Sequence, residues 1–175
     1  MYQDQQDQLS VSCEGLLFRV FQQPNALSDR TGSVVALTSP HPGAGVTHIT
    51  GALLDVLRRD GHASAISLSA RQLACDSGTS TQSSLASALE AIRREYRYAL
   101  IDCGSMKTSQ AAIRLAPLVD GMILVSQANR TQPEQIQYAE KTIEAVNGRI
   151  LGHVLNKRTY VIPGWFHRMM DGAGI

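Results

Sequence analysis

Short apolar runs alternate with helix-length amphipathic stretches through most of this chain. The runs are rich in Val, Ile and Leu, which is typical of parallel strands buried on both faces. Between them, apolar residues recur at the three- and four-residue spacing of a helix. This alternation predicts βαβ units with right-handed crossovers, and hence an α/β fold with a doubly wound, mostly parallel sheet flanked by helices in three layers. The predicted strands are 34–38, 63–69, 98–101, 122–125 and 150–155.

Stop signals and capping residues bound the predicted helices. Gly61 ends a helix over 47–60, and Gly148 ends the helix before the last strand. Thr131 and Glu134 at the start of that last helix have the spacing of a capping box, in which two side chains satisfy free N–H groups of the first turn. The other predicted segments are helices over 85–96 and 108–118 and a polar loop over 75–84.

The length of 175 residues suits one domain. We predict a polar lead over 1–12, an α/β domain over 13–158 and an aromatic and basic tail over 159–175. Sixteen Lys and Arg against fifteen Asp and Glu leave no basic excess, which argues against nucleic acid as a partner. The start has no signal-peptide pattern, no apolar run reaches the ~20 residues of a membrane span, and the cysteines lack metal-binding spacing. These features predict a cytoplasmic protein.

The loop after the first predicted strand is the first place to look for function, because ligands of open parallel sheets sit at the carboxyl ends of the strands. A phosphate-binding loop follows the pattern G-x-x-x-x-G-K-[ST], in which the Lys reaches the phosphates and the hydroxyl holds magnesium. The second glycine and the hydroxyl residue of this pattern are matched by Gly45 and Thr47, and Gly43 fits its glycine-rich character. The first glycine position is occupied by Pro40 and the lysine position by Val46.

Val46 is the decisive departure, because a valine cannot offset phosphate charge. His41 and His48 lie nearby in the sequence, but neutral imidazoles are poor replacements for a lysine. The loop alone therefore leaves two interpretations open. It is either a degenerate phosphate-binding loop or a tight glycine-proline connection of the kind that any doubly wound sheet needs.

Four separated segments resemble the P-loop domain of the bacterial tyrosine autokinases of capsule and exopolysaccharide synthesis, in the MinD and ParA-like group. Together they cover roughly residues 14 to 160. The resemblance implies a P-loop fold, and it implies that Tyr98 to Asp102 form the Walker B strand. The segments are VVALTSPHPGAGVTHITGALLDVLRRDGH over 34–62, YALID over 98–102, DGMILV over 120–125 and LGHVLNKR over 151–158.

Several features of that family are missing. The family places a lysine at position 46 and an Asp-x-Asp pattern where this chain has 68–70, which reads Leu-Ser-Ala. The family has an N-terminal oligomerisation pattern, Glu-x-x-Arg-x-x-Arg. Counted from Glu14, the two arginine positions of this pattern are occupied here by Leu17 and Val20. The family's C-terminal tyrosine cluster, the phosphate acceptor, is reduced to Tyr160. These departures predict a catalytically impaired relative.

The resemblance also assigns the candidate site residues. Asp102 would bind magnesium through water together with Thr47, but it can equally be satisfied by neighbouring backbone N–H groups, and the missing ligands favour the second interpretation. Asn156 would contact adenine, or simply cap the chain after the last strand. We therefore expect no catalytic residue and no metal, and only absent or weak ATP and magnesium binding. The residues expected to contact any nucleotide are Gly43, Ala44, Gly45, Val46, Thr47, His48 and Asn156.

Both ends of the chain carry apolar groups that suit contacts with a partner. A helix predicted over 13–21 presents the apolar residues of a candidate homo-oligomer contact, which are Leu16, Leu17, Val20 and Phe21. In the tail, Trp165 and Phe166 stand among basic residues. They either fold back onto the domain or touch the inner membrane peripherally, and the modest basic count favours folding back.

Three functions follow from these observations. The first is a pseudokinase, a non-catalytic regulator or scaffold whose partner is a membrane-embedded polysaccharide chain-length co-polymerase or an active autokinase. The second is an active ATP-dependent tyrosine kinase or ATPase with non-standard phosphate ligands, such as His48 or Arg71. The third is a MinD- or ParA-like placement protein. Phosphoryl transfer depends on positioned charge, so the missing lysine and carboxylates favour the first.

Overall fold

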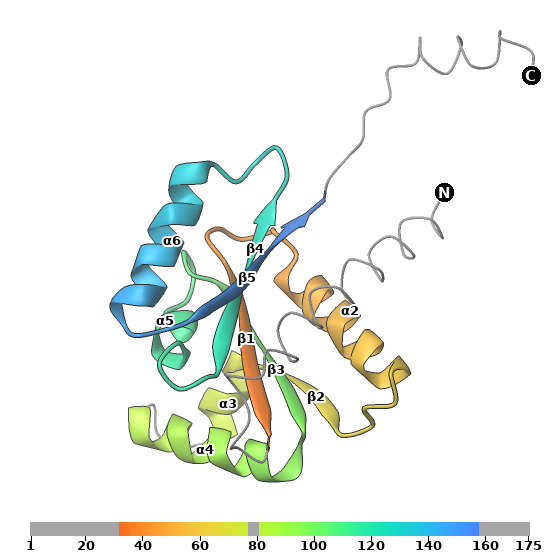
Figure 1. The fold of residues 1–175 in the computed structure, drawn as a ribbon. Helices are drawn as coiled ribbons and strands as arrows, with labels where there is room; N and C mark the ends of the chain where they lie inside the picture. The colour runs from red at the N-terminus through yellow and green to blue at the C-terminus, as the bar shows by residue number, and fades with distance from the viewer. Residues whose placement is uncertain (1–31, 77–80, 158–175) are drawn as a thin grey trace, which may run out of the picture.

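A five-stranded sheet forms the centre of the computed structural model, which describes residues 32–76 and 81–157 (Figure 1). The strand order is β2–β3–β1–β4–β5, and every neighbouring pair is parallel. The predicted α/β fold with a parallel sheet is confirmed. The strands are β1 (Ser33–Ser39), β2 (Ala65–Ser69), β3 (Tyr98–Ser105), β4 (Gly121–Gln127) and β5 (Ile150–Asn156).

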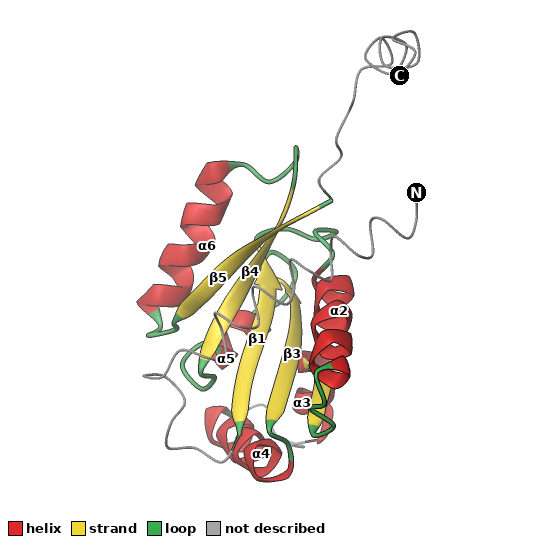
Figure 2. Cartoon of the chain, turned by 45° about the vertical axis from the view of Figure 1, so that its right-hand side comes forward, coloured by secondary structure: helices red, strands yellow, loops and turns green. Residues whose placement is uncertain are grey.

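Helices cover both faces of the sheet, as Figure 2 shows, and two apolar clusters fill the space between the layers. On one face, α2 packs its apolar stripe against side chains of β1, β3 and β4, including Leu37 and Ile123. On the other face, the remaining helices pack against residues such as Val34 and Ala36. Alternate β1 residues thus enter opposite cores. The helices are α2 (Val46–Arg59), α3 (Ala70–Asp76), α4 (Gln82–Glu95), α5 (Ala111–Leu115) and α6 (Pro133–Ala145).

Helix α3 was not predicted, and the predicted polar loop over 75–84 is shorter than expected because α3 and α4 extend into it. A capping box starts α3 directly after β2. The Ser69 backbone N–H donates to the Gln72 side-chain oxygen at 2.8 Å, and the Arg71 N–H donates to the Ser69 hydroxyl at 3.3 Å. The Ser-x-x-Gln spacing that signals this start is present in the sequence.

The predicted capping box of Thr131 and Glu134 is wrong by one residue. The structure places Gln132 at the N-cap of α6 and closes the box with Gln135, whose side-chain oxygen accepts the Gln132 backbone N–H at 3.1 Å. Pro133 explains the shift, since its fixed φ suits the first helical position and makes the preceding residue the cap. The Gly61 stop is confirmed, with φ at 83° immediately after α2.

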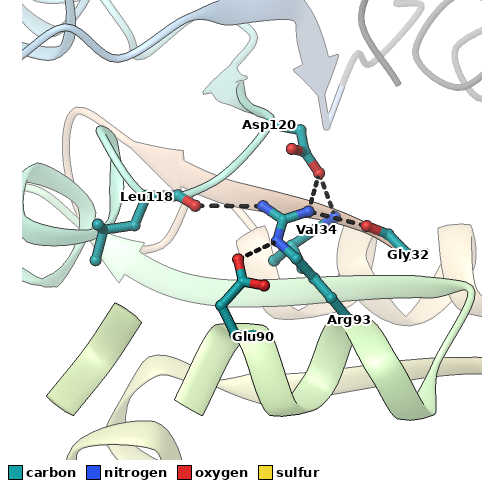
Figure 3. Close-up of polar contacts among 6 residues, drawn as sticks. All are labelled: Gly32, Val34, Glu90, Arg93, Leu118 and Asp120. Carbon is teal, nitrogen blue, oxygen red and sulfur yellow. Dashed lines mark hydrogen bonds and ion pairs between the residues drawn. The ribbon is translucent and has the colours of Figure 1, made fainter. Parts of the chain in front are cut away.

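A buried arginine joins α4 to the amino ends of β1 and β4 (Figure 3). Arg93 is 2% exposed, and its Nη1 donates to the Asp120 carboxylate at 2.6 Å and to the Gly32 carbonyl at 2.9 Å. Its Nη2 donates to the Leu118 carbonyl at 3.3 Å. The same Asp120 oxygen accepts the Val34 backbone N–H at 2.7 Å. One carboxylate thereby neutralises the guanidinium and also accepts the backbone N–H of Val34 at the start of β1.

This network predicts a large effect of a single substitution. Arg93→Met leaves Asp120 buried without its counter-charge, which should lower the free energy of unfolding by about 3–5 kcal/mol. Adding Asp120→Asn should restore part of this loss, because the amide oxygen still accepts the Val34 N–H and no unpaired charge remains. Urea denaturation measures both effects.

The matched control is Glu90→Gln. Glu90 lies 3.6 Å from Arg93 Nε and is 56% exposed, so its loss should change stability by less than about 0.5 kcal/mol. A single Arg93→Met variant as stable as this control would show that the pair does not hold the sheet edge together.

Candidate functional site

The loop between β1 and α2 depends on two glycines in the left-handed region. Gly43 has φ at 85°, and Gly45, the N-cap of α2, has φ at 95°. Side chains with a Cβ rarely adopt this conformation. A Cβ on Gly45 would also lie 2.3 Å from the side-chain nitrogen of Asn156. The loop is thus shaped by glycine and packed closely against the end of β5.

Val46 lies under the loop and points into the protein. It is 6% exposed and belongs to the apolar cluster that contains Leu37 of β1, Ile49 and Leu53 of α2, and Ile123 of β4. The position where a phosphate-binding loop carries its lysine is therefore part of the hydrophobic core. Burying a valine side chain stabilises the fold by roughly 1.5–3 kcal/mol, whereas a charge at this place would lose its hydration.

Two residues at the end of β5 hold the loop from the side. The Asn156 side-chain amide donates to the Ala44 carbonyl at 2.8 Å, and its oxygen accepts the Lys157 backbone N–H at 2.8 Å. The Lys157 ammonium donates to the Gly43 carbonyl, also at 2.8 Å. Asn156 is 9% exposed, and both ends of its amide are engaged. These bonds fix two consecutive carbonyls of the loop.

Thr47 and Asp102 meet at the mouth of the sheet. The Thr47 hydroxyl donates to Asp102 Oδ2 at 2.5 Å, and Asp102 Oδ1 accepts the Gly104 backbone N–H at 2.8 Å. The interpretation that neighbouring groups satisfy Asp102 agrees with this geometry. Mg²⁺ takes six oxygens, and these two side chains supply only two of them, so any ion here would depend on water and phosphate for the rest. Within 32–76 and 81–157, no cluster of three His, Cys, Asp or Glu residues forms a metal site.

The loop after β4 forms the other wall of this region. His41 Nε2 and Thr131 Oγ1 are 2.7 Å apart, and Thr131 Oγ1 also accepts the Gln127 backbone N–H at 2.8 Å. The guanidinium of Arg130 reaches the loop as well, because a Cβ on Gly43 would lie 3.5 Å from its Nη1. The glycine-rich loop is therefore bordered by a histidine contact and by two cations, Arg130 and Lys157.

The end of β2 carries no acidic group. Leu68, Ser69 and Ala70 stand where the resemblance places an Asp-x-Asp pattern, and Ser69 is used to start α3. On β3, Cys103 follows Asp102 but is 4% exposed. Burial, and secondarily the Asp102 charge, raises the pKa of the Cys103 thiol to about 12, so it stays a neutral thiol at physiological pH. The end of β2 therefore offers no carboxylate, and the buried thiol on β3 is a poor nucleophile.

The structure brings the predicted site residues together at the carboxyl edge of the sheet. The loop residues, Thr47, Asp102 and Asn156 all lie there, while His48 is exposed on the first turn of α2. Arg130 and Lys157, which border the loop, were not predicted as site residues from the sequence. Lys157 follows the strand-ending Asn156 directly, which is the one sequence signal that could have placed it at this edge.

Some predictions fall outside the described residues. They concern the helix over 13–21 with Leu16, Leu17, Val20 and Phe21, the tail with Trp165 and Phe166, and Tyr160. None of the helices in the described ranges is long and apolar enough to cross a membrane.

Comparison with known proteins assigns the fold. The chain is similar to the chimeric protein CapA2B2, with a TM-score of 0.70 and 15% identity over 85% of this chain and 84% of that one. It is also similar to the kinase domain of the Escherichia coli tyrosine kinase ETK, with a TM-score of 0.67 and 14% identity over 86% and 78%. The VpsO kinase domain matches with a TM-score of 0.65 and 19% identity over 91% and 100%. No protein-family model and no curated protein sequence matches the chain.

Gly45→Ala tests whether the loop shape depends on glycine. The left-handed φ and the close approach to Asn156 should together lower the free energy of unfolding by about 1–2 kcal/mol or more. Gly51→Ala is the control, because Gly51 lies within α2 and a Cβ there meets nothing within 4 Å. It should stabilise the protein by about 0.5–1 kcal/mol. Thermal denaturation that shifts in the same direction for both variants would contradict this geometry.

At this level of identity the comparisons establish the fold, and the chain has the fold of bacterial tyrosine kinase domains.

Proposed function

We propose that the protein is a catalytically impaired relative of the tyrosine autokinases, a pseudokinase that acts as a regulator or scaffold in capsule or exopolysaccharide export. The observation that carries this proposal is the burial of Val46, which is 6% exposed at the position of the phosphate-binding lysine. Introducing a lysine at position 46 would require more than a surface substitution, because the Val46 side chain packs in the core beneath the loop.

The missing carboxylates support the same proposal. Phosphoryl transfer relies on positioned cations that neutralise the transferring group and on residues that orient the nucleophile. The β2 end supplies no Asp or Glu within 65–73, and the Ser69 position is committed to the start of α3. With neither the lysine nor the carboxylate pair, most of the catalytic power of such a site is lost.

The preserved architecture suggests what remains useful. The parallel sheet, the glycine-shaped loop and the Thr47–Asp102 contact persist without the charges that catalysis needs. A domain that keeps its shape but not its chemistry is suited to binding the partners of its active relatives. We propose as partner a membrane-embedded chain-length co-polymerase or an active autokinase, met at the cytoplasmic side of the inner membrane.

One observation favours a second candidate, an ATP-dependent kinase or ATPase with unusual phosphate ligands. The Thr47 hydroxyl and the Asp102 carboxylate lie 2.5 Å apart, in the place where a P-loop enzyme holds magnesium. Asp102 would then act through water, and Asn156 would lie near any bound base. The two candidates differ in whether the protein transfers phosphate.

A phosphorylation assay separates these candidates. Incubation of the unmodified chain with ATP and magnesium should give no phosphotyrosine by mass spectrometry, at Tyr160 or elsewhere. Val46→Lys should strengthen ATP binding only partly, because Leu68 and Ala70 still provide no carboxylate, and it should lower the melting temperature by placing a charge in the core. Phosphorylated Tyr160 in the unmodified protein would refute the pseudokinase and support the second candidate.

A further inference from the structure

Strand β5 forms one edge of the sheet, and its outer side carries backbone groups that the sheet does not use. Within 32–76 and 81–157, β5 pairs only with β4, at the end of the strand order (Figure 2). The Asn156 carbonyl accepts the first N–H after β4 at 2.8 Å, and the Val154 carbonyl accepts a β4 hydroxyl at 3.3 Å. Backbone groups alternate in direction along a strand, so those of His153 and Leu155 point away from the sheet.

An exposed apolar side chain stands beside this edge. Leu155 is 58% exposed, although it belongs to a strand of the central sheet. It lies on the same face of β5 as His153, which reaches the Glu140 carboxylate of α6 at 3.0 Å. Val154 faces the other way and packs against the apolar cluster beneath α2. An edge strand with available N–H and C=O groups and an uncovered leucine is a template for a further strand.

The chain that follows β5 has the composition and the position of such a strand. Residues 159–162 read Thr-Tyr-Val-Ile, which are all residue types favoured in strands, and Pro163 and Gly164 end the run. At Lys157 the backbone φ is 57°, a left-handed value that is uncommon outside turns. The chain therefore turns at the end of β5, and a segment that returned along the outer edge would run antiparallel to it.

We propose that residues 160–162 add a strand to this edge, antiparallel to β5, and that this strand covers Leu155. A four-residue hairpin loop, which is a common length, pairs Tyr160 with Leu155. Two residues further on, Ile162 pairs with His153. This register uses the outward backbone groups of both β5 residues, and it sets the tyrosine ring beside the exposed leucine on the α6 face of the sheet. The inference goes beyond the proposed function and does not rest on it.

Pro163 fits the same register. The backbone groups of Tyr160 and Ile162 face β5 in this pairing, so those of Val161 and Pro163 face the solvent. Proline has no N–H to donate, and it is tolerated in a sheet at such an outward position of an edge strand. The added strand is thus short and ends in a proline, two features that protect a sheet edge from further pairing.

A second copy of the chain suits this edge less well. The symmetric pairing that uses the whole of β5 is centred on His153, and it sets Arg149 of one copy opposite Lys157 of the other. Like charges directly opposite each other destabilise a strand pair. The segment over 160–162 needs no association step, because it is joined to the end of β5 through a few residues. Its pairing is therefore independent of protein concentration.

Hydrogen exchange of single backbone amides, measured by NMR on the full chain, tests the added strand. The His153 and Leu155 amides should exchange at least about tenfold more slowly than in an unstructured peptide, at every protein concentration. The Val154 and Asn156 amides face β4 and report that the sheet is folded. Ile162→Pro removes a donor that faces β5, so both outward amides should return to about the unstructured rate while Val154 and Asn156 stay protected.

Two substitutions at exposed hydrophobic residues give a matched comparison. Leu155→Asp removes the apolar contact at the edge and should speed exchange of the His153 amide by about tenfold. Tyr138→Asp is the control and should leave that exchange unchanged. Tyr138 is 72% exposed, but it lies two residues before Glu140 and so points to a different side of α6 from the side that meets β5.

Other outcomes would overturn the proposal. Exchange of the outward amides at the unstructured rate in the unmodified chain would show that the edge is open. Protection that survives Ile162→Pro would also overturn it, and a loss of that protection on dilution would assign the edge to a second copy. Trp165, the single tryptophan of the chain, reports on the membrane alternative. A shift of its fluorescence with phosphatidylglycerol vesicles, together with unprotected outward amides, would assign the tail to a lipid surface.

Discussion

The guanidinium of Arg93 sits where α4, β1 and β4 come together, and it is almost entirely shielded from water. A charge in that place is tolerated because Asp120 pairs with it and the carbonyls of Gly32 and Leu118 accept two further N–H groups of the guanidinium. The same carboxylate receives the Val34 N–H, so the start of the central strand is set by this pair. Gly32 could carry no side chain here, because a Cβ would lie 2.3 Å from the Tyr96 carbonyl oxygen. The amino edge of the sheet is thereby fixed, which leaves the carboxyl edge free to carry loops.

At the carboxyl edge, the loop between β1 and α2 owes its shape to glycines and to hydrogen bonds from the end of β5. Left-handed glycines turn the chain, and Asn156 and Lys157 hold the loop carbonyls from β5. Val46 contributes to the core instead of to the ligand site. Packing and hydrogen bonds shape the loop, and Arg130 and Lys157 border it.

Much of this fold could be predicted from the sequence, because buried parallel strands consist of short apolar runs such as the one after Ser33. The errors in the predicted helix starts came from local capping signals. The capping box of Ser69 and Gln72 was overlooked, and Pro133 moved the cap of α6 to Gln132. The absence of a lysine at position 46 could also be recognised from the sequence, since it depends on the identity of one residue at one position.

The origin of the charges around the loop could not be predicted in the same way. Lys157 meets Gly43 across 114 residues of sequence, and Arg130 reaches the same glycine from a loop without any motif. Likewise, Arg93 looks like one more arginine at the end of a helix until the fold places Asp120 beside it across 27 residues. Such pairings depend on the topology of the sheet, which brings distant chain segments to one edge.

We propose that the β1–α2 loop has the shape of a phosphate-binding loop but does not support phosphoryl transfer. The most direct test of this proposal is isothermal titration of the unmodified chain with ATP and magnesium, followed by measurement of ADP release from the same sample. We expect a dissociation constant of about 0.1 mM or weaker and no ADP above the level of the buffer. Micromolar binding together with steady ADP release would contradict it.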